Sequence, residues 1–269
     1  MNWMRAGRSL VPAPVRRALR TLIGSGDARF AGPFPDWESA AAAAGGYDAA
    51  GILAKVREAA RAVRRGDAAF ERDSVTFAAP EPWPHTAVLE RLARGRNGRL
   101  NVLDFGGSLG STYGQCRRFL GSVERLRWRI VEQPAFVAVG RREFETPELG
   151  FFDSIEEASA DEPPDLALFS SSLQYVRDPG DVARRIARVS PRVILVDRVP
   201  LGDAESIWVQ HVPPAIYRAS YPFRVFTRAR LAALFGDRWR ATADLPPTPF
   251  PGLERRTGAR YGGLLLERG

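Results

Sequence analysis

The chain has few of the residues that carry metal or redox chemistry. It contains one cysteine, Cys116, and two histidines, His85 and His211, which lie far apart in the sequence. A single cysteine excludes a disulfide within the chain and a cysteine-rich metal site. Two separated imidazoles argue against a bound zinc or iron ion. The sequence therefore predicts no metal, and its thiol content is compatible with a reducing compartment, so a cytoplasmic location is expected.

Long apolar runs are also missing, since no stretch approaches the roughly 18 consecutive apolar residues of a transmembrane helix. Arginines interrupt the apolar residues of the first 23 positions, which argues against a secretory signal. Within them, Pro14–Ile23 has the composition of a short basic amphipathic helix. This segment predicts weak peripheral contact with a membrane or a partner, and a partly disordered leader is the alternative.

Lysine is nearly absent, because Lys55 is the only one and arginine supplies almost all of the positive charge. The net charge of +8 is compatible with anionic partners such as nucleic acid. The arginines are spread along the chain and form no basic stripe, however, which favours a genome rich in arginine codons as the explanation. We therefore expect no nucleic-acid partner.

Composition and periodicity divide the chain into three parts. Residues 1–33 are expected to be a basic leader and linker, because Gly24–Pro35 is rich in glycine and proline. Residues 34–98 show helical spacing and are expected to form a helical cap, with helices after Asp36, over Asp48–Arg65 and over His85–Ala93. Residues 99–269 are expected to form one α/β domain.

Short apolar runs alternate with helical segments in this third part, which is typical of a parallel sheet built from βαβ units. The expected strands are Leu100–Phe105, Arg127–Glu132, Gly150–Phe152, Leu166–Ser170, Arg192–Asp197 and Gly262–Leu266. The expected helices are Ser111–Leu120, Phe136–Phe144, Ile155–Ala158, Pro179–Val189 and Thr227–Phe235.

The strongest local signal is Asn101–Ser111, where an apolar strand runs into a glycine-rich turn and then into a helix. Glycines allow the turn to close sharply and let a ligand approach the backbone. The N-terminus of the following helix offers unpaired N–H groups. The residues expected to contact a cofactor here are Asp104, Gly106, Gly107, Ser108 and Gly110.

Asp104 distinguishes two kinds of cofactor, since dinucleotide-binding proteins share such loops. A carboxylate two residues before Gly106 would repel the pyrophosphate of a dinucleotide. The same carboxylate would attract the α-ammonium group of a methionine moiety. The loop therefore favours S-adenosylmethionine (SAM) over NAD.

Polar residues also follow the next three predicted strands. Glu132 ends the second strand, where a carboxylate can accept hydrogen bonds from both ribose hydroxyls of a nucleoside; a surface carboxylate is the alternative. The other cofactor contacts expected at these strand ends are Gln133, Asp153 and Ser154 near the nucleoside, and Ser171, Leu173 and Gln174 along the methionine arm.

These residues resemble the motifs of class I SAM-dependent methyltransferases. The family pattern is an acidic residue followed by three glycines at alternate positions, and Asp104, Gly106 and Gly110 match it, with Ser108 in place of the middle glycine. The resemblance implies a Rossmann-like class I methyltransferase fold, here with a helical N-terminal extension, and SAM as the cofactor.

A second resemblance covers nearly the whole chain. It is to an uncharacterised bacterial family of proposed methyltransferases, whose members often accompany polysaccharide or surface-glycan biosynthesis. The resemblance implies a bacterial cytoplasmic enzyme that methylates a sugar or a glycan precursor. The segments that carry it are Phe34–Trp37, Gly46–Asp48, Phe70–Ser74, Leu103–Ser111, Val131–Gln133, Ser171–Tyr175 and Asp197–Arg198.

A polar and aromatic group follows the fifth strand, where such enzymes often bind the acceptor. An ordinary histidine titrates near neutral pH, so His211 is expected to be the general base, with a structural role as the alternative. Asp197 and Tyr175 are the other catalytic candidates. The residues expected to bind the substrate are Arg198, Gln210, Tyr217 and Tyr221.

The sequence thus predicts SAM-dependent O-methylation of a sugar, a glycan precursor or another small metabolite. One alternative is a nicotinamide-dependent oxidoreductase on a similar fold, which Asp104 disfavours. The other is a non-catalytic SAM-binding or assembly protein, which the intact loop disfavours. The fold does not define the acceptor, and the oligomeric state is left open.

Overall fold

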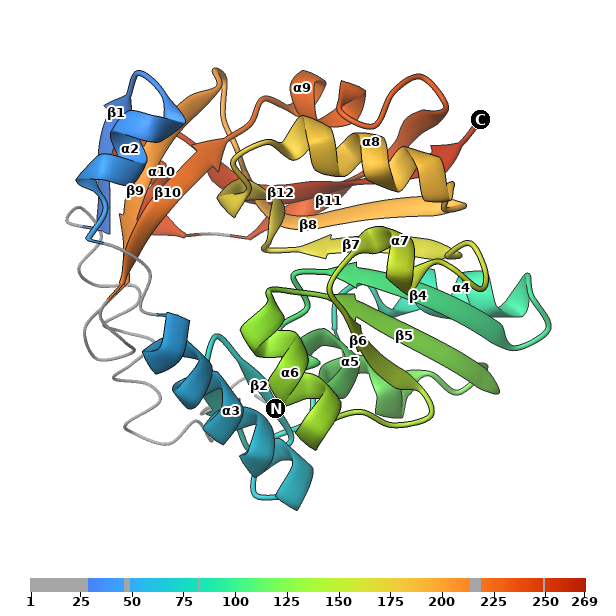
Figure 1. Cartoon of the computed structure of the whole chain (residues 1–269). Coiled ribbons are helices and arrows are strands. Elements are labelled where there is room, and N and C mark those ends of the chain that lie inside the picture. Colours follow the sequence, from blue (N-terminus) through green and yellow to red (C-terminus); the bar gives the residue numbers. More distant parts are fainter. Residues whose placement is uncertain (1–28, 46–48, 82, 213–218, 249) are drawn as a thin grey trace, which may run out of the picture.

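The centre of the molecule is a seven-stranded sheet in the order β11-β12-β8-β7-β4-β5-β6 (Figure 1). The computed structural model describes residues 29–45, 49–81, 83–212, 219–248 and 250–269. Strands β4 to β8 are parallel, whereas β12 pairs antiparallel with both β8 and β11. The strands are β4 (Arg99–Phe105), β5 (Arg125–Val131), β6 (Leu149–Phe152), β7 (Leu166–Ser170), β8 (Val193–Leu201), β11 (Trp239–Thr248) and β12 (Arg260–Arg268).

This strand order is that of the Rossmann-like class I methyltransferase fold, which confirms the predicted fold class. All six predicted strands are present, and β8 and β12 are longer than predicted. The order reverses beside β4, because β5 and β6 follow on one side and β7 and β8 on the other. In open α/β sheets ligands bind at the carboxyl ends of the strands at such a reversal, and the glycine loop lies there.

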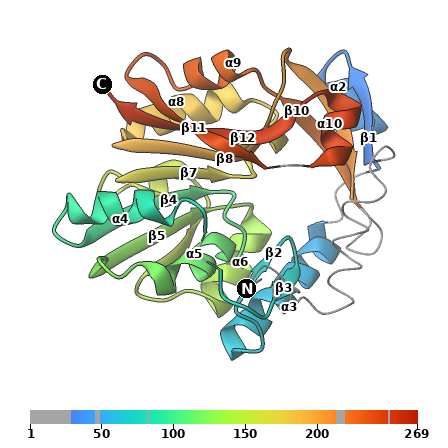
Figure 2. The same cartoon turned by 180° about the vertical axis from the view of Figure 1, so that it is seen from behind.

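Helices cover both faces of the sheet. The helices α7, α8 and α9 cover one face, and α4 and α5 cover the other (Figures 1 and 2). Leu89 of α4 is fully buried in the cluster that contains Leu100 of β4, so α4 belongs to the sheet layers although its residues were predicted to be part of a separate cap. The helix bounds are α4 (Thr86–Arg94), α5 (Ser111–Cys116), α6 (Pro134–Glu143), α7 (Ile155–Ala158), α8 (Pro179–Val189) and α9 (Arg228–Ala233).

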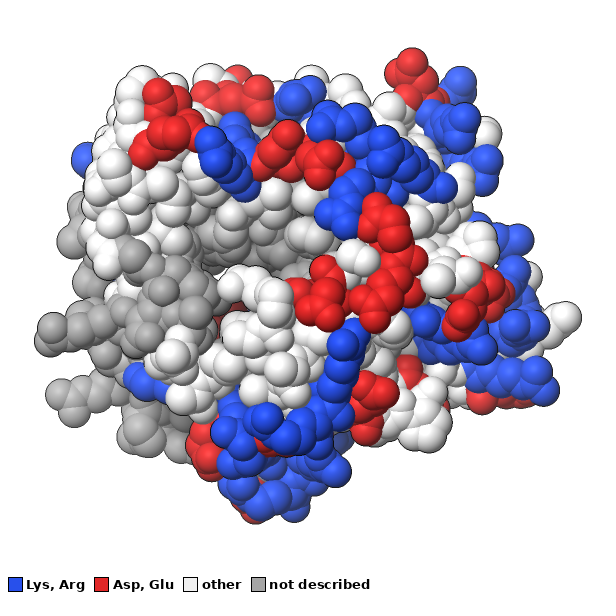
Figure 3. All heavy atoms as spheres, in the orientation of Figure 1, with Lys and Arg blue, Asp and Glu red and all other residues white. Residues whose placement is uncertain are grey.

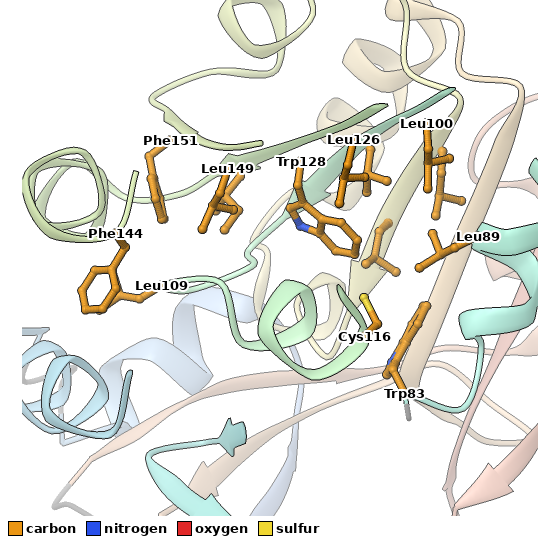
Figure 4. Close-up of a cluster of buried hydrophobic side chains, with 14 of the residues drawn as sticks. Trp83, Leu89, Leu100, Leu109, Cys116, Leu126, Trp128, Phe144, Leu149 and Phe151 are labelled. Atoms are coloured by element: carbon orange, nitrogen blue, oxygen red, sulfur yellow. The ribbon is translucent and has the colours of Figure 1, made fainter. Parts of the chain in front are cut away.

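The core on the α5 side is built around Trp128 of β5. Figure 4 shows its indole between Leu149 and Leu126, with Cys116 of α5 facing it. Trp83 closes the cluster and is 2% exposed. Burying an indole stabilises a fold by a few kcal/mol, so Trp83 holds the segment before α4 in place. That segment carries His85.

The N-terminal part contains the predicted helices α2 (Trp37–Ala43) and α3 (Ala49–Arg65), and Asp36 accepts the N–H of Ser39 at 2.7 Å as the N-cap of α2. It also contains strands that were not predicted. Residues expected to be linker form β1 (Phe30–Phe34), which pairs with β9 (Ser206–His211), and β9 pairs with β10 (Ser220–Val225). The other unpredicted elements are strand β11 of the central sheet, the hairpin β2 (Phe70–Arg72) and β3 (Val75–Phe77), and the helix α10 (Pro251–Thr257).

Two predictions fall outside the described residues, namely the membrane contact of residues 1–23 and the substrate contact of Tyr217. Within the described ranges, no helix has the length and apolarity needed to cross a membrane. In the same ranges, no three His, Cys, Asp or Glu side chains gather as the ligands of a metal ion would.

A β-bulge interrupts the pairing of β8 with β12. Gly262 lies opposite Val199 and Leu264 lies opposite Val196, so Asp197 and Arg198 together face the single residue Gly263. Arg198 has a φ of 52°, a left-handed conformation that costs a non-glycine residue roughly 1–2 kcal/mol.

The bulge changes the direction of two consecutive side chains. In a regular strand they would point to opposite faces. Here Ser170 Oγ donates to Asp197 Oδ2 at 3.2 Å and accepts from Arg198 Nη2 at 3.1 Å. Bulges commonly re-aim side chains beside active sites, and this one brings a carboxylate and a guanidinium to the same hydroxyl.

Replacing Gly263 by alanine is expected to disrupt the bulge. A Cβ atom there would lie 2.0 Å from the carbonyl oxygen of Val196, so the two strands would have to separate. We expect G263A to lower the free energy of unfolding by about 1–3 kcal/mol, measured by urea denaturation. In the control G114A the new Cβ meets no atom within 4 Å, and helix propensity should raise stability by about 0.5–1 kcal/mol. Equal effects of the two substitutions would contradict the role given to Gly263.

Candidate cofactor and acceptor site

Two loops and the bulge in β8 meet at the carboxyl edge of the sheet. The first is the glycine loop after β4, and the second is the loop after β7 that begins with Ser171 and Ser172, here called the serine loop. A Cβ atom on Gly106 would lie 2.6 Å from Ser172 Cβ, so the two loops are in contact. The N–H of Ser171 donates to the carbonyl of Asp197 at 2.9 Å, which joins the second loop to the bulge. Figure 3 shows a hollow between the halves of the molecule that carry α8 and α6, and most of the described atoms that border it are uncharged.

The glycine loop keeps its shape although a serine stands at its centre. Gly106 and Gly110 have φ values of 75° and 97°, and Ser108 has a φ of 57°. Ser108 therefore adopts the left-handed conformation that glycine adopts at little cost. Its small side chain is compatible with a loop that the family pattern builds from glycine.

Asp104 lies directly beneath this loop. Its side chain is 1% exposed, and its Oδ2 accepts the indole N–H of Trp128 at 2.9 Å. A Cβ atom on Gly107 would lie 2.5 Å from the same oxygen, so only glycine allows the loop to pass so close. Burial raises the pKa of Asp104 to about 7, although the hydrogen bond from Trp128 acts in the opposite direction.

Glu132, directly after β5, ties the glycine loop to the neighbouring strand. Its Oε2 accepts the N–H of Gln133 at 2.7 Å, and its carboxyl also accepts a backbone hydrogen bond from Ser108. Burial raises the pKa of Glu132, which these hydrogen bonds partly offset. The carboxylate lies at the strand end where a nucleoside ribose is expected.

The residues predicted to contact the adenine have other partners in the structure. Asp153 is exposed, and its carboxylate lies 3.4 Å from Arg141. Ser154 is the N-cap of α7, because its hydroxyl accepts the N–H of Glu157 at 3.1 Å. Their expected contact with the cofactor stays a prediction.

The serine loop is held by a buried amide. Gln174 is fully buried and donates to Ser171 Oγ at 3.2 Å and to the carbonyl of Arg198 at 3.3 Å. Leu173 is also fully buried, in the core cluster that includes Val182 of α8. The expectation that the Leu173 side chain lines the methionine arm needs correction, because the 3-10 helix η3 (Leu173–Tyr175) turns this side chain into the core.

An imidazole–carboxylate pair occupies the edge beside the serine loop. His85 Nε2 lies 3.1 Å from Asp197 Oδ1, and the two side chains are 12% and 10% exposed. Burial opposes ionisation of Asp197, but the hydrogen bond from His85 and the nearby charge of Arg198 outweigh it, so its pKa is lowered. Sequence reasoning identified Asp197 and missed His85, since 112 residues separate them.

His211, the predicted general base, lies elsewhere. It is the last residue of β9, it is exposed, and its backbone pairs with Ser220. Among the described residues, no hydrogen bond or ion pair joins His211 to Asp197. The structure therefore brings Asp197 together with His85 and not with the predicted histidine.

Aromatic side chains from η3, β10 and β12 cluster next to the serine loop. The hydroxyl of Tyr175 donates to Gln210 Oε1 at 2.9 Å, and its ring centroid lies 5.0 Å from that of Tyr221. Tyr261 of β12 hydrogen-bonds to Tyr175, and burial raises the pKa of Tyr261. Three of the predicted residues, Tyr175, Gln210 and Tyr221, are thus brought together, and Tyr261 was not predicted.

The hairpin β2–β3 covers the start of α5, next to the glycine loop. Ser111 Oγ donates to Glu71 Oε1, and Arg72 Nη2 donates to Gln115 Oε1 at 3.0 Å. Glu71 is 4% exposed, and burial raises its pKa to about 7. The hairpin thus places Arg72 near Arg198 and Asp197, whose charges affect the pKa of Arg72.

Within the part of the chain that the structure describes, several buried polar atoms at this edge have no hydrogen-bond partner. They are Ser172 Oγ, Gln174 Oε1 and Arg198 Nε. Such atoms are rare in folded proteins, because each costs about 1–3 kcal/mol. Their presence beside the glycine loop is compatible with a polar ligand that completes their hydrogen bonds.

Comparisons with known proteins give distant likenesses only. No protein-family model and no curated protein matches the chain. The structure is similar to the 1,6-didemethyltoxoflavin N1-methyltransferase of Burkholderia thailandensis, with 18% identity, a TM-score of 0.47, and coverage of 82% of this chain and 89% of that one.

Two other solved structures show a comparable likeness. For the N-terminal domain of EvdMO1, solved with S-adenosylhomocysteine and D-fucose, the identity is 15%, the TM-score 0.47, and the coverage 83% of this chain and 97% of that one. For CalS10, an amino pentose methyltransferase from Micromonospora echinaspora, the identity is 14%, the TM-score is 0.40, and the coverage is 78% of this chain and 96% of that one. Likeness at this level establishes no family and no activity, so the fold class rests on the strand order.

The raised pKa values of Asp104 and Glu71 predict a pH-dependent stability. Between about pH 4 and pH 7 the folded state holds protons that the unfolded chain has released, so stability falls as pH rises. Each carboxyl should contribute a slope of up to about 1.4 kcal/mol per pH unit. Urea denaturation of the cofactor-free protein at pH 5 and pH 7 measures the total.

The variant D104N should remove the contribution of Asp104, up to about 1.4 kcal/mol per pH unit, and leave that of Glu71 and Glu132, whose pKa values are also raised. E124Q changes an exposed carboxylate at the opposite end of β5 and should leave the slope unchanged. An unaltered slope in D104N would show that Asp104 is ionised throughout this range.

Proposed function

We propose that the protein is a SAM-dependent methyltransferase that acts on a hydroxyl group of a small acceptor. The observation that carries this proposal is the position of the His85–Asp197 pair on the same edge as the glycine loop, joined to it through Ser171 and Ser172. A proton acceptor beside a nucleoside-binding loop is what transfer to a hydroxyl requires.

The residues at this edge fit the cofactor. Glu132 is at the place where a carboxylate can bind ribose hydroxyls, and Asp104 provides negative charge beneath the loop for the methionine ammonium group. A bound ammonium would favour the ionised form of Asp104 and so oppose its raised pKa. The chemistry that SAM supplies when bound is a sulfonium methyl group open to in-line displacement.

His85 is proposed to remove the acceptor proton. An ionised Asp197 accepts the Nε2–H of the imidazole, which leaves Nδ1 as the proton acceptor. The same carboxylate then stabilises the imidazolium that forms. Asp197 therefore orients the base, much as the aspartate does in a Ser-His-Asp triad.

A sugar, a glycan precursor or another small hydroxylated metabolite is the proposed acceptor. The resemblance to the bacterial family associated with polysaccharide biosynthesis supports this class, and Tyr175, Gln210 and Tyr221 provide aromatic and polar groups suited to a sugar. A bacterial cytoplasm is the proposed location. The buried thiol of Cys116 is compatible with it.

Calorimetric titration with S-adenosylhomocysteine and, separately, NADH tests the cofactor. We expect binding of the first only, weakened about 10- to 100-fold in E132Q because a charged hydrogen bond to ribose is lost. The control is E124Q, at the other end of the same strand. Binding of NADH alone would favour an oxidoreductase, and binding of neither by folded protein would favour a non-catalytic role.

His85→Asn is expected to reduce kcat by about 10²- to 10⁴-fold, since a general base contributes a factor of that size. Binding of S-adenosylhomocysteine should be unaffected. H211N is the matched control and should keep nearly full activity. Turnover is followed as release of S-adenosylhomocysteine with the most active sugar acceptor. A large loss of activity in H211N with H85N intact would restore His211 as the base.

A further inference from the structure

The amino edge of the central sheet carries a charged recess with a volume of about 150 Å³. It lies where β4 begins, and β4 has seven residues, so roughly 20 Å of strand separates it from the glycine loop. Figure 3 shows Lys and Arg side chains gathered at this edge of the molecule, where β4 and β5 start in Figure 1. Four arginines and two carboxylates line the recess, namely Arg96, Arg99, Arg125, Arg127, Glu162 and Asp165.

The alternation of side chains along β5 explains why arginines occupy this face of the sheet. Arg125 and Arg127 point to the same face as Val131, because residues two apart in a strand share a face. Val131 belongs to the core cluster that contains Ile155 of α7. Since α7 has only four residues, it covers the end of β5 and not its beginning. Arg125 and Arg127 are therefore exposed to solvent.

The register of the two strands brings the arginines together. Arg99 of β4 lies directly opposite Arg125 of β5, and Arg127 lies opposite Asn101. Neighbouring strands are about 4.8 Å apart, so the three guanidinium groups share one small region. Like charges at opposite positions of a sheet repel one another. The arrangement is therefore unfavourable by itself and would become favourable with a negative charge between the arginines.

The two carboxylates of the recess are engaged mainly by Arg96. Its guanidinium lies 2.7 Å from Glu162 and 3.4 Å from Asp165. The guanidinium groups of Arg99 and Arg127 lie 3.6 and 4.0 Å from Glu162, beyond hydrogen-bonding distance. Among the described residues, the side chain of Arg125 has no ion pair and no hydrogen bond. Three of the four arginines thus keep donors for a further negative group.

The charges around the recess leave an excess of positive charge. Arg192 lies 3.9 Å from Asp165, and Glu124 is exposed at the start of β5. Arg129 and Asp161 form a pair of their own at 3.2 Å. When these residues are added to those that line the recess, six arginines stand against four carboxylates, which leaves two positive charges.

The floor of the recess is fixed by hydrogen bonds. Asn101 is 4% exposed, and its backbone N–H donates to Asp165 Oδ2 at 2.9 Å. Its side-chain amide donates to the carbonyls of Glu162 and Pro163, both at 3.2 Å. These bonds tie the segment that carries Glu162 to β4, so the recess is formed without a ligand.

We propose that this recess binds the phosphate group of a small molecule through Arg99, Arg125 and Arg127. A phosphate monoester carries about −1.5 to −2 charges at pH 7, which matches the local excess of two positive charges. Guanidinium groups bind phosphate through pairs of N–H donors. A recess of about 150 Å³ can hold a phosphate group but not a nucleic-acid helix. The site is separate from the cofactor edge, so the proposal is independent of the methyltransferase function.

Calorimetry with three anions tests this site. Inorganic phosphate, glucose 1-phosphate and acetate are titrated into the full chain at constant ionic strength in sodium chloride. We expect at least one of the two phosphates to bind with a Kd of about 1 mM or tighter, and acetate, which has a single charge, to bind about tenfold or more weakly. Tighter binding of glucose 1-phosphate identifies an esterified phosphate as the ligand, and tighter binding of inorganic phosphate identifies the free ion.

The double variant R125Q/R127Q should weaken phosphate binding about tenfold or more. Its Tm in sodium chloride should equal or exceed that of the original protein, because repulsion between like charges is relieved. The variant R125K/R127K keeps the charge without the guanidinium fork and should bind with intermediate affinity; it also serves if R125Q/R127Q does not fold. The control R238Q/R240Q removes two exposed arginines with the same spacing next to and within β11, at the far end of the sheet, and should bind phosphate within about twofold of the original affinity.

Three results would overturn the proposal: no binding of either phosphate at about 10 mM, binding of acetate as tight as that of phosphate, or phosphate binding that R125Q/R127Q leaves unchanged. Binding of RNA or of phosphatidylglycerol vesicles that depends on Arg125 and Arg127, without binding of the small phosphates, would also overturn it. Loss of S-adenosylhomocysteine binding has no bearing on this site, so the failure of the proposed function can be told apart from the failure of the phosphate site.

Discussion

The pairing of two residues of β8 against one glycine of β12 is the constraint on which the candidate site depends. Without the bulge, Asp197 and Arg198 would point to opposite faces of the sheet, and only one of them would reach Ser170. With it, the carboxylate meets His85 and the guanidinium stays beside it. The strain at Arg198 and the absence of a side chain at Gly263 are two parts of one arrangement.

A second contact links the hydrophobic core to the cofactor edge. Trp128 packs in the centre of one core cluster and also donates its indole N–H to Asp104. The Asp104 carboxyl in turn lies in close contact with the backbone of Gly107. The position of the glycine loop is therefore coupled to the packing of Trp128. A substitution that alters this packing is expected to change cofactor binding, although the substituted residue does not contact the cofactor.

The sequence contains enough local information for six of the seven strands of the sheet, but not for β11 or for the site. Apolar runs such as Leu166–Ser170 mark buried strands directly, and the glycine loop is defined by consecutive residues. His85 follows a proline-rich segment with no regular pattern, and its partner lies 112 residues away. The packing of Trp83 and of Leu89 in the core beneath β4 brings the two together. Strand β1 was missed for a similar reason. Gly32 and Pro33 are typical of a linker, and the partner strand β9, which provides the hydrogen bonds of β1, is distant in the sequence.

The place of Gly263 in the chain has a consequence for how the protein becomes functional during synthesis. Domains form progressively as a chain leaves the ribosome, and β4 to β8 can begin to associate while β12 is still unmade. The bulge needs β12 as its partner. Asp197 and Arg198 therefore acquire their final directions only after the other strands of the sheet have been synthesised, so the candidate site forms later than the strands that surround it.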